Sequence, residues 1–367
     1  MTLKALSRQR ANSDMAVLVG LLAIALVAPL AIYPVFLMNV LCFALFALAF
    51  NLLVGYTGLL SFGHAMFFGF AAYVSAHLTK IGEVRLPYWL GSWSWVTIPL
   101  PPLTPELAIL CATVVAALLG LVAGIIAIRR QGIYFAMVTL ALAQMVFFFC
   151  IQAKFTGGED GIQAIPRRPL FGLIDIRDDI GLYYVVLVIF AGGFLIIYRT
   201  IYSPFGQILK AIRENEARAI SLGYATDRFK LIAFVLSAAL AGCAGATKAI
   251  VFQLASLTDV QWQMSGEVVL MTLVGGMGTV FGPIAGAAII VTMQNYLASF
   301  GEWVLIIQGL VFVVAVLLFR RGIVGELLAY LSRRRRRRIE NAAAIEVTSR
   351  TARKPRIPAP SGVASHE

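Results

Sequence analysis

Long apolar runs, separated by short polar segments, account for most of the chain. Ten such runs can be marked, at 16–33, 36–54, 64–79, 107–128, 133–152, 181–198, 231–252, 264–280, 282–298 and 303–319. A helix needs about 20 apolar residues to cross the hydrocarbon core of a bilayer. The pattern therefore predicts an all-α integral membrane protein with about ten transmembrane helices.

The composition supports this prediction. Hydrophobic residues make up 60% of the 367 residues and charged residues only 13%, and the mean hydropathy is +0.86. A soluble domain carries about 45–50% apolar and about 25% charged residues, so a single soluble domain is excluded. The cysteines lie inside apolar runs without C-x-x-C spacing, and we interpret them as packing residues: Cys42, Cys111, Cys150 and Cys243.

The lysines and arginines predict an orientation. With ten spans both termini share one side of the membrane, and most basic residues fall on that side. The positive-inside rule makes it the cytoplasmic side. The net charge of +12 is then explained by topology, and no nucleic-acid partner is expected.

This orientation divides the chain into three parts. We expect a cytoplasmic N-terminus at 1–14, a transmembrane domain at 15–330 and a basic tail at 331–367. Within the domain, the segment 199–230 is expected to be a cytoplasmic loop, and the segments 80–106 and 153–180 to be periplasmic loops. The tail carries the arginine run Arg333–Arg338, and we expect it to be disordered and to contact lipid headgroups.

Motifs for chemistry are missing from the sequence. There is no G-x-x-x-x-G-K-[ST], no H-E-x-x-H and no G-x-S-x-G, so the chain has no P-loop, zincin or hydrolase signature. Its three histidines, His64, His77 and His366, are scattered. We therefore expect a conduit rather than an enzyme, without a cofactor or metal of its own, driven by a partner or by an ion gradient.

Two glycine-rich segments interrupt the apolar pattern. One runs from Asn51 to His64 and the other from Gly275 to Gly286. Irregular backbone at membrane depth is tolerated only where protein buries it or where it lines a water-filled cavity. One interpretation is a pair of broken or re-entrant helices in two internal repeats, with a transport path between them. The other is short cytoplasmic turns with packing glycines. Small-residue spacings typical of helix packing occur at Gly120/Gly124, Ala241/Gly245 and Gly282/Gly286.

Ionisable residues inside the apolar runs are few. Lys248 and Glu267 stand out, because a charge inside a bilayer is costly and is a functional candidate by default. They could pair across adjacent spans, or Lys248 could snorkel to the interface. An ion-coupled secondary transporter that uses Lys248 and Glu267 is therefore the alternative function.

The segment 199–230 is amphipathic and carries both signs of charge. Its pattern predicts a short helix that Gly223 closes. Such a helix could lie on the membrane surface or dock into a groove on a partner. The mixed charge favours the partner over lipid.

This loop resembles the coupling loop of ABC-importer membrane subunits, in which a Glu-Ala-Ala stretch precedes a Gly. Here Asn215-Glu216-Ala217-Arg218-Ala219 precedes Gly223. Further segments narrow the resemblance: NLLVGYTGLLSFGHAMFFGFAAY at 51–73, TGGEDG at 156–161, IAFVLSAALAGCAGA at 232–246 and GGMGTVFGPIAG at 275–286. From about residue 36 to 325 the chain resembles the LivM-type permeases of the branched-chain amino acid ABC transporters.

The resemblance implies a multi-pass protein of the bacterial inner membrane. Its partners would be two cytoplasmic ATPases that use ATP and Mg²⁺, a second, LivH-type permease, a periplasmic solute-binding protein and membrane lipid. The solute would be a branched-chain amino acid, a urea, an amide or an aromatic acid.

The resemblance implies roles for three groups of residues. The ATPase-coupling group is Arg213, Asn215, Glu216, Ala217, Ala219 and Gly223. The pathway and gating group is Asn51, Gly55, Gly58, Ser61, His64, Glu267, Gly275, Gly276 and Gly278. The group on the binding-protein side is Gly157, Gly158, Asp160 and Gly161.

Overall fold

The computed structural model describes most of the apolar part of the chain. The described residues are 20–80, 83–87, 95–99, 103–130, 132–169, 178–298, 301, 303–318 and 322–326. The expected N-terminal segment 1–14 and the tail 331–367 lie outside these residues. Apart from four short strands and a few 3-10 turns, the regular structure described is α-helical, which confirms the all-α prediction.

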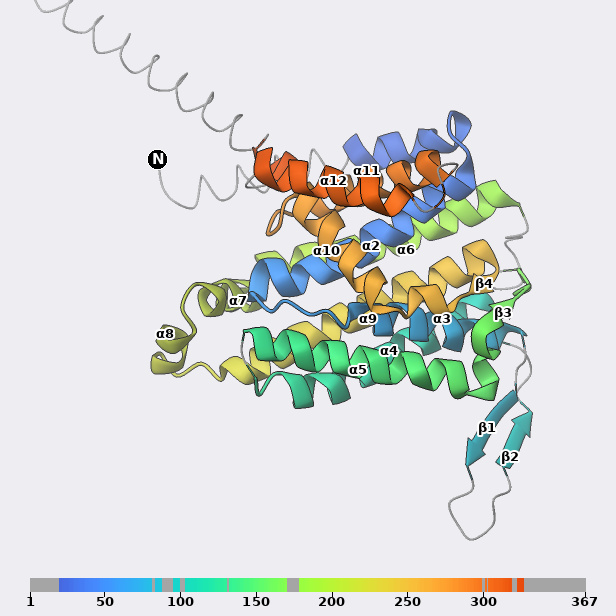
Figure 1. Cartoon of the computed structure of the whole chain (residues 1–367), viewed down its shortest axis with the longest axis horizontal. Coiled ribbons are helices and arrows are strands. Elements are labelled where there is room, and N and C mark those ends of the chain that lie inside the picture. Colours follow the sequence, from blue (N-terminus) through green and yellow to red (C-terminus); the bar gives the residue numbers. More distant parts are fainter. Residues whose placement is uncertain are drawn as a thin grey trace, which may run out of the picture.

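The elements follow the apolar runs closely (Figure 1). A short apolar helix covers Gly20–Leu30. The others are α2 (Pro34–Thr57), α3 (His64–Lys80), β1 (Glu83–Pro87), β2 (Trp95–Pro99), α4 (Pro105–Ala127), α5 (Ile133–Gln152), η2 (Lys154–Thr156), η3 (Gly158–Asp160), β3 (Ile162–Gln163), α6 (Asp179–Tyr202), α7 (Pro204–Glu214), α8 (Glu216–Ser221), α9 (Thr226–Phe252), β4 (Leu254–Ala255), η4 (Leu257–Asp259), α10 (Trp262–Gly275), α11 (Gly282–Leu297) and α12 (Trp303–Leu318).

Among the described residues, five helices are long and apolar enough to cross a membrane: α2, α4, α5, α6 and α9. By contrast α3, α10, α11 and α12 have 17, 14, 16 and 16 residues, which is short of the about 20 that a span needs. A multi-span helical protein is therefore established, whereas the number ten is not. The antiparallel pairs β1–β2 and β3–β4 were not predicted.

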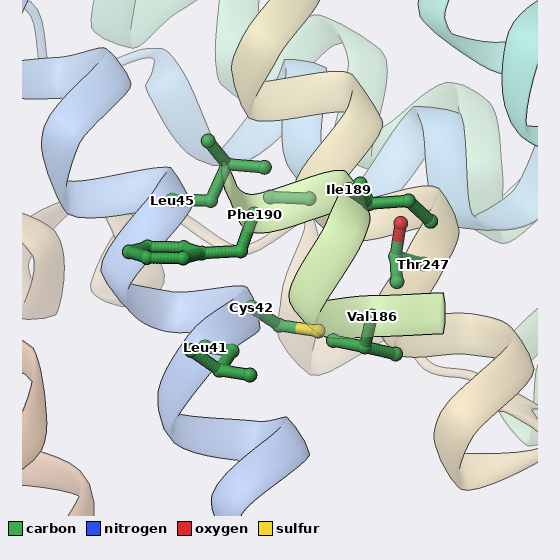
Figure 2. Close-up of a pocket in the computed structure, with 8 residues that line it drawn as sticks. Leu41, Cys42, Leu45, Val186, Ile189, Phe190 and Thr247 are labelled. Atoms are coloured by element: carbon green, nitrogen blue, oxygen red, sulfur yellow. The ribbon is translucent and has the colours of Figure 1, made fainter. Parts of the chain in front are cut away.

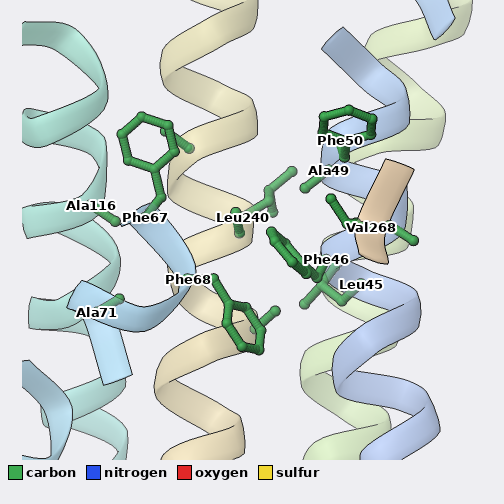
Figure 3. Close-up of a cluster of buried hydrophobic side chains, with 14 of the residues drawn as sticks. Leu45, Phe46, Ala49, Phe50, Phe67, Phe68, Ala71, Ala116, Leu240 and Val268 are labelled. Atoms are coloured by element: carbon green, nitrogen blue, oxygen red, sulfur yellow. The ribbon is translucent and has the colours of Figure 1, made fainter. Parts of the chain in front are cut away.

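Helix α2 lies at the centre of the molecule. Its side chains are buried without interruption from Cys42 to Thr57, because α6, α9, α10 and α11 surround it and Phe68 of α3 packs against it. A helix that is apolar on all sides is typical of such a position. Figure 3 shows Phe46 of α2 beside Phe68 of α3, and the rings of Phe46 and Phe68 stack at 4.4 Å.

Small residues let α9 approach its neighbours closely, as their spacing predicted. A Cβ atom at Gly120 of α4 would lie 2.5 Å from Cβ of Ala238. One at Gly124 would lie 2.7 Å from the side chain of Leu231. At Gly245 an added Cβ would collide with the Phe68 carbonyl of α3. These contacts confirm the packing role of the glycines.

The two ends of the helix bundle differ in character. Figure 1 shows α7 and α8 projecting at one end and the four strands at the other. Contacts place the turn after α2 and the turn between α10 and α11 at the α7 end. The described parts of the segments 80–106 and 153–180 lie at the opposite end.

Candidate functional site

The polar loop 199–230 contains two helices where the sequence analysis expected one. Helix α7 begins after Ser203, whose side chain accepts a hydrogen bond from the Gly206 N–H at 3.3 Å. Asn215 is extended and ends α7, and its Oδ1 accepts from the Arg218 N–H at 2.9 Å to cap α8. An Asn that can cap a new helix competes with helix continuation, and this competition explains the break.

Gly223 closes α8, as predicted. Its φ of +87° is left-handed, and its N–H donates to the Ile220 carbonyl at 2.9 Å. A glycine in this position after the last helical residue satisfies carbonyls that the helix leaves open.

Helix α7 lies against the bundle on one face. Leu209 and Ile212 are buried there. Lys210 places its ammonium 5.6 Å from the Tyr56 ring of α2 and 5.8 Å from the Tyr202 ring of α6. This burial lowers the pKa of Lys210 below its usual value. One face of α7 is thus fixed to the ends of two long helices, α2 and α6.

Arg213 connects α7 to the end of α2. Its Nη1 donates to the Gly55 carbonyl, one of the last carbonyls of α2, which no N–H further along the helix can reach. A cation is also favoured at a helix C-terminus by the helix dipole. Gly58 ends α2 with φ +78°, and a Cβ there would lie 3.2 Å from Cγ of Arg213.

Asn51 connects α2 to the second glycine-rich segment. Its Nδ2 donates to the Thr279 carbonyl at 2.9 Å, and its Oδ1 accepts from the Gly278 N–H at 2.9 Å. The side chain is 1% exposed. One amide therefore satisfies both a donor and an acceptor of the partly buried turn between α10 and α11.

These contacts converge at one place, which we call the glycine junction: Asn51, Gly55, Arg213, Gly278 and Thr279. A Cβ at Gly55 would lie 2.8 Å from the Gly278 nitrogen, and one at Gly278 would lie 3.2 Å from Nη1 of Arg213. The sequence analysis identified most of these residues separately. The structure brings the two glycine-rich segments and the polar loop into contact.

Three other residues of the pathway group, Gly275, Ser61 and His64, lie outside the glycine junction. Gly275 packs inside the α10–α11 hairpin, where an added Cβ would lie 3.0 Å from the Gly286 nitrogen. Ser61 and His64 are fully buried. His64 Nε2 is 2.8 Å from the Ser237 hydroxyl, and its ring lies edge-on to Phe50, Phe67 and Phe234.

Several contributors were not identified from sequence. Thr279 lies within the glycine-rich segment that the analysis singled out, and its hydroxyl donates to the Gly276 carbonyl at 2.7 Å. Lys210 was counted only among the basic residues of the polar loop. At Gly322, an added Cβ would collide with Gly276, so the segment 322–326 packs on the same turn. No local pattern marks Gly322, because its role depends on contacts with a distant segment.

The suggested pair between Lys248 and Glu267 is wrong. Lys248 Nζ is 2.5 Å from Oδ1 of Asp259, and Glu267 accepts from Gln294 Nε2 at 3.0 Å. The Lys248 side chain is 17% exposed, and its ammonium lies 5.2 Å from the Phe43 ring. Asp259 escaped notice because it lies in η4, outside the apolar runs.

The residues expected on the binding-protein side lie in a compact turn at the strand end of the bundle. Gly157 and Gly161 flank the short turn η3, which begins at Gly158. Asp160 is exposed, and its carbonyl accepts from Gln163 Nε2 at 3.3 Å. Strand β3 then pairs with β4, so the turn is fixed to the end of α9.

A small apolar pocket lies between α2, α6 and α9 (Figure 2). It leaves no room for a molecule the size of water, and Leu41, Cys42, Phe190 and Thr247 are among the residues that line it. The lining contains no charged side chain. Among the described residues, no group of histidines, cysteines and carboxylates has the arrangement of a metal site.

Long apolar helices around a buried centre, with a two-helix polar loop connected to two glycine-rich turns, define a multi-span helical membrane protein. The family model described as "Branched-chain amino acid transport system / permease component" matches residues 32–316. The chain belongs to this family. Together with the apolar helices, this membership makes it a multi-pass protein of the inner (plasma) membrane.

Curated relatives agree with the family. The chain is 30% identical over 290 residues to the high-affinity branched-chain amino acid transport system permease protein LivM of Escherichia coli, and 29% identical over 290 residues to its counterpart in Salmonella typhimurium. These alignments cover 73% of this chain and 64% of each relative, so the chain spans less than two thirds of their length. A ribose import permease, RbsC of Bacillus subtilis, is 32% identical over 127 residues, covering 32% of this chain and 39% of the relative. No solved structure matches.

Proposed function

We propose that this chain is the permease subunit of an ATP-driven importer and forms part of the path for branched-chain amino acids or a related small amide or amino-acid solute. In this proposal a solute-binding protein delivers the solute, a second, LivH-type permease completes the path, and two separate ATPases bind ATP and Mg²⁺. The family and the names of the LivM relatives support it. The observation that carries it is the glycine junction, because Arg213 ties the polar loop to both glycine-rich turns.

We further propose ten spans with both termini cytoplasmic. The short helices α10, α11 and α12 would then cross the membrane with the help of their flanking turns. The basic residues of the polar loop support this orientation. An internal repeat would relate the two glycine-rich segments, each of which lies between two consecutive helices at the same end of the bundle.

The outer face of α8 is the proposed docking surface for an ATPase. Three apolar side chains stand exposed there on a polar loop: Ile220, Leu222 and Tyr224 at 55%, 70% and 41%. Exposed apolar groups on a cytoplasmic segment are typical of a protein interface. The structure changes one expectation here, because Ala219 is buried within the chain and is unavailable to a partner in this conformation.

Coupling would follow the chain of contacts from α8 to the glycine-rich turns. Movement of α8 displaces α7, to which Asn215 joins it directly. Arg213 then shifts relative to the Gly55 carbonyl and to Gly278. The turn after α2 and the turn between α10 and α11 would therefore move together, as alternating access requires.

The alternative of an ion-coupled transporter is not favoured. It placed Lys248 and Glu267 in one proton relay. The structure gives the two residues different partners, Asp259 and Gln294.

The test is solute uptake by the complete complex in liposomes, with a pull-down of the ATPases from detergent. Leu222→Asp should lose the ATPases. Arg213→Ala should retain them but lower uptake about tenfold or more, because a hydrogen bond from a charged group contributes about 1.5–3 kcal/mol. ATP hydrolysis should persist in Arg213→Ala.

Arg228→Ala is the matched control, because Arg228 is an exposed arginine of the same loop and should behave as wild type. If wild type binds no ATPase, or if an ion gradient drives uptake without ATP, the proposal is wrong. Equal uptake by Arg213→Ala and wild type would remove the glycine junction from the coupling route.

A further inference from the structure

Glu267 is an ionisable residue on a helix of otherwise apolar and neutral residues. It lies five residues into α10, and neither α10 nor α11 contains a lysine or arginine. Among the described residues, Gln294 donates the one hydrogen bond that the Glu267 carboxylate accepts. A carboxylate has room for about four such bonds, so most of this capacity is open.

The charges around Glu267 do not balance within the described residues. Lys248 and Asp259 are the charged groups that act on it electrostatically, and these two neutralise each other at 2.5 Å. Three rings around the Lys248 ammonium, those of Phe43, Phe68 and Phe252, hold it in that pair. Among the described residues no lysine or arginine forms an ion pair with Glu267 itself, and an ionised carboxylate without such a partner is costly at membrane depth.

The side of the hairpin that carries Glu267 differs from the lipid-facing sides. Gln263, one helical turn earlier on α10, is exposed, as is Asn295 beside Gln294 on α11. An added Cβ at Gly266 would meet nothing within 4 Å. By comparison, α6 presents Val188 at 70% exposure and Leu195 at 55%. Amides and a carboxylate are expected to face water or a polar solute rather than lipid.

We propose that Glu267 and Gln294 form a binding site for the ammonium group of the transported solute, at the outer mouth of the path. The start of α10 follows β4 and η4 at the strand end of the bundle, which places this site opposite the glycine junction. The carboxylate neutralises the ammonium, and Gln294 orients the carboxylate. The proposal rests on the proposed import function, and it assigns a substrate group to one pair of side chains.

The experiment uses a reporter thiol in the assembled complex. The four native cysteines, which are all free, are replaced by alanine, and ATP-driven uptake by this parent complex is confirmed first. Leu270→Cys then places a thiol one turn deeper than Glu267 on the same side of α10. Its labelling rate is compared for a cationic methanethiosulfonate, carrying trimethylammonium, and an anionic one, carrying sulfonate.

The cationic reagent should react about tenfold faster than the anionic one, because a single negative charge one helical turn away attracts one reagent and repels the other. Glu267→Gln should bring the ratio close to one, whereas Glu267→Asp should keep it well above one. Val188→Cys is the depth-matched control, nine residues into α6, and should react with neither reagent if it faces lipid.

Two leucine fragments then test the ligand group. At millimolar concentration, 3-methylbutylammonium should slow labelling of Leu270→Cys, and 4-methylpentanoate should not. In Glu267→Gln the protection by the ammonium should disappear. These measurements need no turnover, so their outcome is separate from that of the uptake assay.

Three results would overturn the site. One is a thiol at 270 that neither reagent reaches. Another is a ratio that Glu267→Gln leaves unchanged, which would mean that a proton already neutralises the carboxylate. The third is equal protection by the carboxylate fragment. Loss of uptake by the parent complex would count against the proposed import function instead.

Discussion

Asn51 is the side chain on which the geometry of the second glycine-rich turn depends most directly. Asn51→Leu keeps the approximate volume but leaves the Gly278 N–H and the Thr279 carbonyl without their partner. A fully buried polar group left unsatisfied costs about 1–3 kcal/mol, and these two groups, which are partly buried, should cost less. We expect a lower midpoint of thermal unfolding in detergent and a loss of uptake. Gln152→Leu, on an exposed position at the end of α5, should leave both measurements near wild type.

Gly55 has no room for a side chain. A methyl group there would collide with the Asn51 amide and lie 2.8 Å from the Gly278 nitrogen, and overpacking of this kind costs about 1–3 kcal/mol. Gly55→Ala should therefore destabilise the protein and uncouple ATP hydrolysis from uptake.

Gly192→Ala provides the matched comparison, because an added Cβ on that helical glycine of α6 meets nothing within 4 Å. Alanine is the better helix former, so this variant should be neutral or slightly stabilised. Similar unfolding midpoints for the two variants would contradict the close approach of Gly55 and Gly278.

At the scale of elements, the attachment of α8 depends on an ion pair with α9. Glu216 contacts Lys230, whose side chain is 4% exposed. Removal of one partner leaves a nearly buried charge without compensation. Glu216→Lys should therefore release α8 and weaken ATPase capture in the pull-down.

The double variant Glu216→Lys with Lys230→Glu should restore capture, because it rebuilds the pair with the charges exchanged. If capture stays lost in the double variant, Glu216 contacts the ATPase directly, as the sequence resemblance implied.

The apolar pattern predicted the long helices well, because a long run of apolar residues in a membrane has few alternatives to a helix. It located α2, α4, α5, α6 and α9 to within a few residues. The break between α7 and α8 escaped it, because Asn215 acts through a cap that the charge pattern does not show. The strands β3 and β4 also escaped it, because their pairing joins the segments after α5 and after α9.

At the scale of the whole molecule, the contacts within the glycine junction could not be predicted from the sequence. In the sequence, Asn51 and Gly55 belong to the first glycine-rich segment, Gly278 belongs to the second, and Arg213 belongs to the polar loop. That they meet follows from how α2, α7 and the α10–α11 hairpin pack together, and no local pattern contains that information. The same holds for Lys248, whose partner Asp259 could be recognised only once η4 was seen to lie against α3.

The central position of α2 has a consequence for how the protein is made. Asn51 belongs to the first long helix, yet it is separated from Gly278 by 227 residues along the chain. Ribosomes add about 5–20 residues per second, so α2 is complete for some tens of seconds before the segment that pairs with Asn51 exists. During that interval the polar Asn51 amide lies in the bilayer or the translocon without its final hydrogen-bond partners. These partners become available only when the last third of the chain is synthesised.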